Sequence, residues 1–158
     1  LPSNQEVEQA IAERNRIFRG EDHEAFLDVM RREALQLMAD LATFDPRLVG
    51  AVLAGTATET NAIELHLFSD AAEEVGAALE GLGLPARPVE QRLRVRRDQA
   101  EPFPGYRFHR GDFEFRLAVF PERGRGNAPL SAIDGRPMRR ATARAVAALL
   151  TQRLRTST

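Results

Sequence analysis

The chain contains no cysteine and no lysine, and these two absences exclude several kinds of chemistry. Without cysteine there is no thiol nucleophile, no disulfide framework and no cysteine-ligated metal site. Without lysine there is no Walker-type phosphate loop, which places a lysine at the β- and γ-phosphates, and no Schiff-base chemistry. All 22 basic residues are arginine, so every permanent positive charge on a side chain is a guanidinium.

The sequence also lacks an excess of either charge and lacks long apolar runs. Its 22 basic and 23 acidic residues give a net charge of -1, which argues against a dedicated nucleic-acid-binding protein. No apolar run approaches the roughly 18–20 residues that span a bilayer, and no secretory signal opens the chain. We therefore expect a cytoplasmic protein without a membrane partner. The 158 residues, 43% of them hydrophobic, suffice for one domain with a normal core.

Apolar residues at helical spacing predict helices near both ends of the chain. We expect an N-terminal helix within residues 1–20 and a domain over residues 22–155. The domain is expected to begin with a helix from Asp22, to contain a shorter helix capped by Asp70, and to end with a helix capped by Thr142.

The remaining segments predict β-strands. Leu48–Leu53 is expected to be a short strand buried on both faces. Ala62–Phe68 and Phe113–Phe120 alternate between apolar and polar residues, and Gly111-Asp112 is typical of a two-residue hairpin turn. Because two helices precede the first strand, a regular βαβ alternation is excluded. The fold class is therefore expected to be α/β (α+β), a mixed β-sheet covered by helices.

The segment from Val52 to Leu67 resembles the signature of the nucleotidyltransferase superfamily that includes DNA polymerase β and kanamycin nucleotidyltransferase. In that family a strand ends in Gly-Ser or Gly-Gly, and a second strand reads Ser-Asp-hydrophobic-Asp-hydrophobic. The resemblance covers roughly Phe26 to Phe120 and implies a nucleotidyltransferase-like fold with a C-terminal helix. The segment Pro129–Ala141 is similar to a small proteobacterial group of such proteins. Some of these are called UDP-N-acetylmuramate–alanine ligase, although this chain lacks the glycine-rich loop and the lysine of that ligase class.

The resemblance assigns phosphate binding to the first part of this segment. Gly55 and Thr56 take the place of the Gly-Ser pair, and Asn61 stands at the serine of the second strand. The backbone N–H groups of such a turn can approach a triphosphate. The loop that follows Thr56 is several residues shorter than the loop that is usual in the family.

The family's carboxylates are only partly retained. Ala62 stands at the first carboxylate and Glu64 at the second, while Glu114 is the expected third carboxylate on a neighbouring strand. Glu64 and Glu114 are thus the candidate catalytic residues and Mg²⁺ ligands. Arg116, one step along the same face, can occupy the third position instead, and we include it among the phosphate-binding candidates. An alanine at the first position removes charge and oxygen donors that Mg²⁺ requires.

Three functions follow from these residues. The first is a nucleotidyltransferase-like protein with eroded carboxylates that is non-catalytic. The second is an active Mg²⁺-dependent nucleotidyltransferase acting on a hydroxyl of a small molecule, protein or RNA, and the third is a protein-interaction module. The partners expected are accordingly a nucleoside triphosphate or another protein.

Two further features have alternative interpretations. His66 shares a strand face with Glu64, which suits a metal ligand or general base, or else it is a buried histidine with a satisfied hydrogen bond. Four arginines between Arg92 and Arg97 can bind phosphate or an RNA backbone. Alternatively, they form the solvated face of an edge strand, where charge discourages aggregation.

Overall fold

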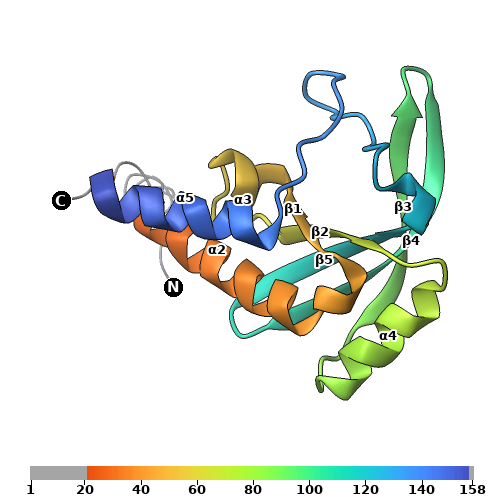
Figure 1. The fold of residues 1–158 in the computed structure, drawn as a ribbon, viewed down its shortest axis with the longest axis horizontal. Coiled ribbons are helices and arrows are strands. Elements are labelled where there is room, and N and C mark those ends of the chain that lie inside the picture. Colours follow the sequence, from red (N-terminus) through yellow and green to blue (C-terminus); the bar gives the residue numbers. More distant parts are fainter. Residues whose placement is uncertain (1–20, 157–158) are drawn as a thin grey trace, which may run out of the picture.

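The computed structural model describes residues 21–156, which form a five-stranded mixed β-sheet with four α-helices and two short 3₁₀ helices (Figure 1). The expected mixed α/β fold is thus confirmed for this part of the chain. The helix expected within residues 1–20 lies outside the described residues. No helix in the described part is long and apolar enough to cross a membrane.

The bounds of the elements show where the chain departs from a simple alternation of helix and strand. In chain order the elements are α2 (Glu21–Asp40), η1 (Ala42–Phe44), β1 (Arg47–Val49), α3 (Gly50–Ala54), β2 (Ile63–Phe68), α4 (Ala72–Gly81), β3 (Arg87–Arg96), β4 (Gln99–Arg110), β5 (Phe113–Phe120), η2 (Glu122–Gly124) and α5 (Ala143–Thr156).

The strand order in the sheet is β1-β2-β5-β4-β3. β2 and β5 pair in parallel, whereas the other three neighbouring pairs are antiparallel. β3, β4 and β5 form a meander, and β5 lies between β4 and β2. The parallel pair at the centre therefore joins the N-terminal part of the domain to the meander.

β4 extends beyond β5, so residues 91–104 of β3 and β4 form a two-stranded arm that projects from the sheet (Figure 1). Pro102 and Pro104 lie in this arm, where no strand of the described residues pairs with β4 on the side away from β3. A proline has no N–H to donate, and it is tolerated where one edge of a strand is unpaired.

One face of the sheet, which we call the packed face, forms the core against the helices. Alternate residues of β2 and β5 point into it, and Figure 1 shows α2 and α5 lying side by side along it. Its fully buried residues come from the sheet and from all four helices, and they include Ile63, Leu65, Leu67, Phe115 and Leu117, with Leu37 of α2, Val52 of α3, Val75 of α4 and Val146 of α5. Most of the apolar area of this domain is removed from water here, which is the main source of its stability.

The opposite face, which we call the open face, is covered at one end by the connecting segment, residues 121–142 between β5 and α5. At that end Phe68, Ala118 and Phe120 form a second small apolar cluster. Arg140 of the connecting segment stacks on two of these rings, 5.0 Å from the centroid of Phe68 and 4.7 Å from that of Phe120. The other end of the open face is not covered by this cluster, and it carries the charged candidates.

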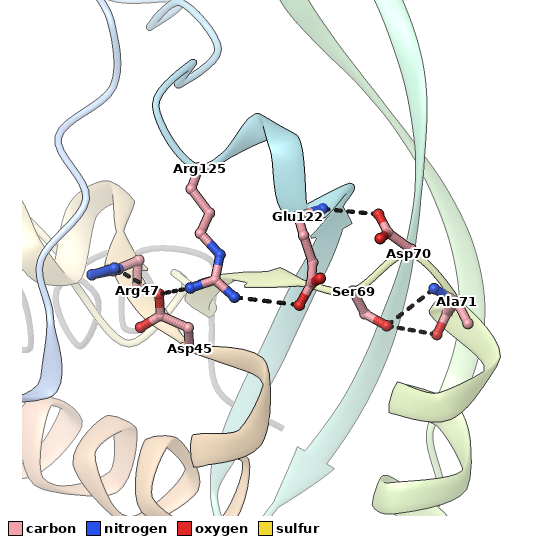
Figure 2. A network of polar contacts seen from close by, with 7 residues as sticks. All are labelled: Asp45, Arg47, Ser69, Asp70, Ala71, Glu122 and Arg125. Atoms are coloured by element: carbon pink, nitrogen blue, oxygen red, sulfur yellow. Dashed lines mark hydrogen bonds and ion pairs between the residues drawn. The ribbon is translucent and has the colours of Figure 1, made fainter.

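Polar contacts attach the connecting segment to the rest of the domain (Figure 2). Arg125 donates to Asp45 at 2.8 Å, and Asp45 also accepts a 2.8 Å hydrogen bond from Arg47 of β1. On the other side, the Glu122 backbone N–H donates to Asp70 at 3.1 Å. The segment is therefore tied both to the start of β1 and to the end of β2.

Two expectations from the sequence are wrong. Leu48–Leu53 is not one strand, because β1 ends at Val49 and α3 begins at Gly50, where φ is +76°. A short apolar run that is buried in either state does not distinguish strand from helix. Asp70 does not cap α4, whose N-cap is Ala71 without a side-chain hydrogen bond, because Asp70 binds the connecting segment instead.

The other strand predictions are confirmed to within a residue. β2 begins one residue after the expected Ala62, and β5 has the expected bounds. Gly111-Asp112 forms the two-residue turn between β4 and β5, with Gly111 at a φ of +60°. Thr142 caps α5 by accepting a 3.1 Å hydrogen bond from the Ala145 N–H.

Candidate site on the open face of the sheet

The two candidate carboxylates lie on the same face of the sheet, as expected. Glu64 of β2 pairs with Arg116 of β5, and Glu114 lies two residues before Arg116 on the same strand. Cross-strand partners share a face, as do residues two apart on a strand. Glu64, Glu114 and Arg116 therefore all belong to the open face, at the end that the connecting segment leaves uncovered.

Glu64 is partly buried beside the start of α3. A Cβ atom at Gly50 would collide with the Glu64 carboxylate, so the absence of a side chain at Gly50 makes room for it. Burial raises the pKa of Glu64 above its usual value, and the positive charge of Arg116 opposes this shift. Within the described residues the side chain of Glu64 has no ion pair or hydrogen bond, so its charge is poorly compensated.

Glu114 is held by two arginines. Its carboxylate forms ion pairs with Arg107 of β4 and, at 3.6 Å, with Arg116, and its side chain is only 17% exposed. Both contacts go to the same carboxylate oxygen, Oε1, and the two guanidinium groups offset the charge of the carboxylate. The arrangement is an ion-pair network and not a free ligand.

The residues present do not fit a two-metal clamp. Ala62 supplies no oxygen at the first carboxylate position, and Glu114 is already paired with arginine. In the described part of the chain, no three histidine, aspartate or glutamate residues come together in a way that could hold a metal ion. Mg²⁺ needs a concentration of anionic oxygens that this face does not offer.

The predicted phosphate turn lies at the C-terminal end of α3. The N–H groups of Gly55 and Thr56 both donate to the Ala51 carbonyl oxygen, at 2.9 and 3.0 Å. Asn61 closes the same turn by accepting a 2.8 Å hydrogen bond from the Thr58 N–H. These backbone donors are thus already paired within the turn. The side-chain hydroxyl of Thr56 remains for a ligand.

Helix α2 fixes this turn from outside. Arg31 donates to the carbonyl oxygens of Val52 and Leu53, both at 3.0 Å, and His23 contacts the Ala57 carbonyl oxygen at 2.9 Å. These carbonyls belong to the last turn of α3 and to the residues after it, where the helix carries partial negative charge. A phosphate is not favoured beside such a helix end.

Gly50 and not Gly55 is the glycine that directly follows a strand. β1 ends at Val49 and is followed by Gly50, whereas Gly55 is the C-cap of α3. The expectation that a strand leads into Gly55 and Thr56 is therefore wrong.

His66 is a structural residue of the open face. It is 3% exposed, and its Nδ1 accepts a 3.0 Å hydrogen bond from the Arg140 Nε–H. Burial, followed by the charge of Arg140, lowers the pKa of His66 to about 3. The imidazole is therefore neutral at ordinary pH, and of the alternatives considered the structure favours the buried histidine with a satisfied hydrogen bond.

Sequence reasoning missed a hollow at the outer edge of the open face. It has a volume of about 380 Å³ and is lined by Pro85, Arg87, Arg107, Phe108 and His109. Alternation within β4 indicated which of its residues share a face. The pairing of β3 with β4, which brings Arg87 beside Arg107, was not evident from either strand alone.

Comparison of the chain with protein-family models, with curated proteins and with solved structures finds no match.

Proposed function

We propose that this chain is a nucleotidyltransferase-like domain that does not carry out metal-dependent transfer and instead binds a phosphate-bearing ligand on its open face. One observation carries the proposal: Glu114, the expected third carboxylate, is paired with Arg107 and Arg116. A metal clamp concentrates negative charge, whereas on this face two guanidinium groups contact the carboxylate that would be its third ligand.

Arginine can take over part of the work that a metal does for a phosphate. A guanidinium presents several N–H donors in a planar fork, and it binds phosphate oxygens without proton loss at any ordinary pH. The environment of Glu64, whose negative charge is poorly compensated, also favours the binding of an anion on this face. Its raised pKa means that this carboxyl gains a proton, and so loses its repulsion toward an anion, more readily than an exposed glutamate does.

Calorimetric titration with ATP, with and without Mg²⁺, tests the proposal. We expect ATP to bind without added Mg²⁺, and we expect no nucleotide to be consumed on prolonged incubation. Glu64→Gln should bind ATP at least as tightly as the wild type, because it removes a negative charge from the face.

Two results would contradict the proposal. Mg²⁺-dependent consumption of ATP that Glu64→Gln abolishes would establish the active transferase. Absence of any heat or thermal stabilisation with ATP and with inorganic tripolyphosphate would remove phosphate binding and favour the interaction module.

A further inference from the structure

Three arginines form a straight row across the open face. Arg116 of β5 pairs with Arg107 of β4, and Arg107 pairs with Arg87 of β3. Their side chains therefore project side by side from three adjacent strands. Neighbouring strands are about 4.8 Å apart, so the row spans on the order of 10 Å.

The row has more positive charge than counter-charge, because two carboxylates, Glu64 and Glu114, lie beside three guanidinium groups. Glu114 pairs with Arg107 and Arg116, and Glu64 lies opposite Arg116 on β2, whereas the side chain of Arg87 has no ion pair or hydrogen bond within the described residues. Like charges that lie directly opposite each other on adjacent strands destabilise a sheet. Two successive arginine pairs are therefore a cost to the fold, and a bound anion would offset it.

The outer end of the row opens into the hollow described above. Arg87, Arg107 and His109 line it, and these three side chains share the open face. The side chains of Arg107 and Arg116 are 41% and 45% exposed, so both remain accessible to a ligand despite their contact with Glu114.

We infer that this row, which we call the arginine row (Arg87, Arg107 and Arg116), binds a chain of phosphates, such as the di- or triphosphate end of a nucleotide, with a terminal phosphate in the hollow. The inference rests on the proposed function, and it names the class of ligand that the open face binds and the residues that bind it. A linear polyphosphate matches the row in shape and charge, since successive phosphates can each meet a different guanidinium. A single phosphate would use only one end of the row.

The test is titration of the whole chain with inorganic tripolyphosphate, pyrophosphate and orthophosphate in the absence of Mg²⁺. We expect affinity to fall in that order. Arg87→Gln should lower the affinity for tripolyphosphate about tenfold. A loss of this size corresponds to the removal of about one charge-assisted hydrogen bond.

Arg94→Gln is the matched control. Arg94 lies on the same strand and is exposed, but its side chain belongs to the opposite face, because it is an odd number of residues from Arg87. The control removes the same charge from the same strand. We expect it to leave the affinity for tripolyphosphate within about twofold of the wild type.

Each remaining outcome overturns a specific statement. Equal losses for Arg87→Gln and Arg94→Gln, or orthophosphate binding as tightly as tripolyphosphate, would overturn the arginine row. If ATP binds but Arg87→Gln and Arg107→Gln bind it as the wild type does, the proposed function stands and the row is not its site. If neither ATP nor tripolyphosphate binds the wild type, the proposed function fails first.

Discussion

At Gly50 the backbone turns from β1 into α3 in a conformation that favours glycine, with φ at +76°. The same residue makes room for the carboxylate of Glu64. A single glycine thus sets both the direction of the chain and the position of a side chain on the open face. Gly50 was not singled out from the sequence, because the apolar run around it looked like one continuous strand.

We expect Gly50→Ala to lower the free energy of unfolding by about 1–2 kcal/mol, because alanine is strained at this φ and its Cβ meets Glu64. Urea denaturation measures the change. Gly126→Ala is the control, since nothing lies within 4 Å of a Cβ placed there. A Gly50→Ala protein as stable as the wild type would show that the turn tolerates a side chain.

His66 shows which part of a residue's environment the sequence does not reveal. Alternation predicted its strand face, but its partner Arg140 lies 74 residues away in the sequence. Neither residue has a local pattern that indicates the other. Its burial and its low pKa follow from how the connecting segment crosses the sheet, which only the structure shows.

The pKa of His66 predicts a pH dependence of stability. The pKa is about 3 in the folded chain and near 6.5 when unfolded, so between these values the unfolded state binds a proton that the folded state does not. Stability should therefore be fully present above pH 6.5 and fall as the pH drops below it. The slope for one proton approaches about 1.4 kcal/mol per pH unit.

Measuring the free energy of unfolding from pH 7 to pH 5 tests this dependence. The measurement is made on the Glu64→Gln variant, because Glu64 also titrates. The raised pKa of Glu64 acts with the opposite sign, giving stability at low pH that is lost as the pH rises through that pKa. In this background His66→Asn keeps an acceptor for Arg140 but cannot titrate. It should flatten the profile, and an unchanged slope would mean that His66 is not responsible.

At the scale of elements, local signals predicted the start of α5 and the β4–β5 hairpin correctly. Thr142 and Gly111-Asp112 act through hydrogen bonds and backbone angles within a few residues. The prediction that Asp70 caps α4 was wrong because the Asp70 carboxylate accepts a hydrogen bond from the backbone N–H of Glu122, 52 positions away. Long-range contacts decide between alternatives that are locally equivalent.

We expect Thr142→Ala to lower the unfolding free energy by about 1 kcal/mol through loss of the hydrogen bond from Ala145 to the cap. Thr142→Ser retains the hydroxyl and should recover most of the loss. Thermal denaturation followed by circular dichroism compares the two variants. Equal stability of the alanine and serine variants would show that the cap contributes nothing.

The connecting segment depends on Asp45, which contacts both Arg47 and Arg125 (Figure 2). Asp45→Asn should hasten tryptic cleavage at Arg123 and Arg125 several-fold while changing stability by about 1 kcal/mol or less, since exposed ion pairs contribute little. Asparagine tolerates the positive φ of +49° at this position.

Asp134→Asn, in the same segment, is the control for this experiment. Asp134 accepts a hydrogen bond from the Arg136 N–H within its own turn, which an asparagine oxygen can also accept. Cleavage that is equally fast in both variants would mean that Asp45 does not hold the segment.

At the scale of the whole molecule, one core joins the four described helices to the sheet, and unfolding should therefore be a single transition. Tyr106 is the only tyrosine and the chain has no tryptophan, so its fluorescence reports on α4 and β4, where its hydroxyl donates to Ala72. Far-ultraviolet circular dichroism reports on all helices. The two signals should give the same midpoint.

Leu37→Ala on α2 should lower the unfolding free energy by about 2–5 kcal/mol and shift both signals together, because Leu37 is fully buried. Val29→Ala on the same helix, where the side chain is 41% exposed, should change it by less than about 0.5 kcal/mol. Separate midpoints for the two signals would show that α4 and β4 unfold independently.

The alternation of apolar and polar residues predicted which face of β2 and β5 would be packed, and therefore where Glu64 and Glu114 would lie. It did not predict the order of the strands. Leu65 pairs with Leu117 across a helix and two strands, and nothing local to either strand indicates that contact. The arginine row follows from the same long-range register.

The two prolines of the arm have a consequence for how copies of this protein behave at high concentration. An unpaired strand edge is a template for aggregation, because its free N–H and carbonyl groups can add a strand from another molecule. Along the unpaired part of β4, Pro102 and Pro104 remove two N–H groups in alternate positions. The arm can therefore project from the sheet without offering that edge as a seed for intermolecular β-structure.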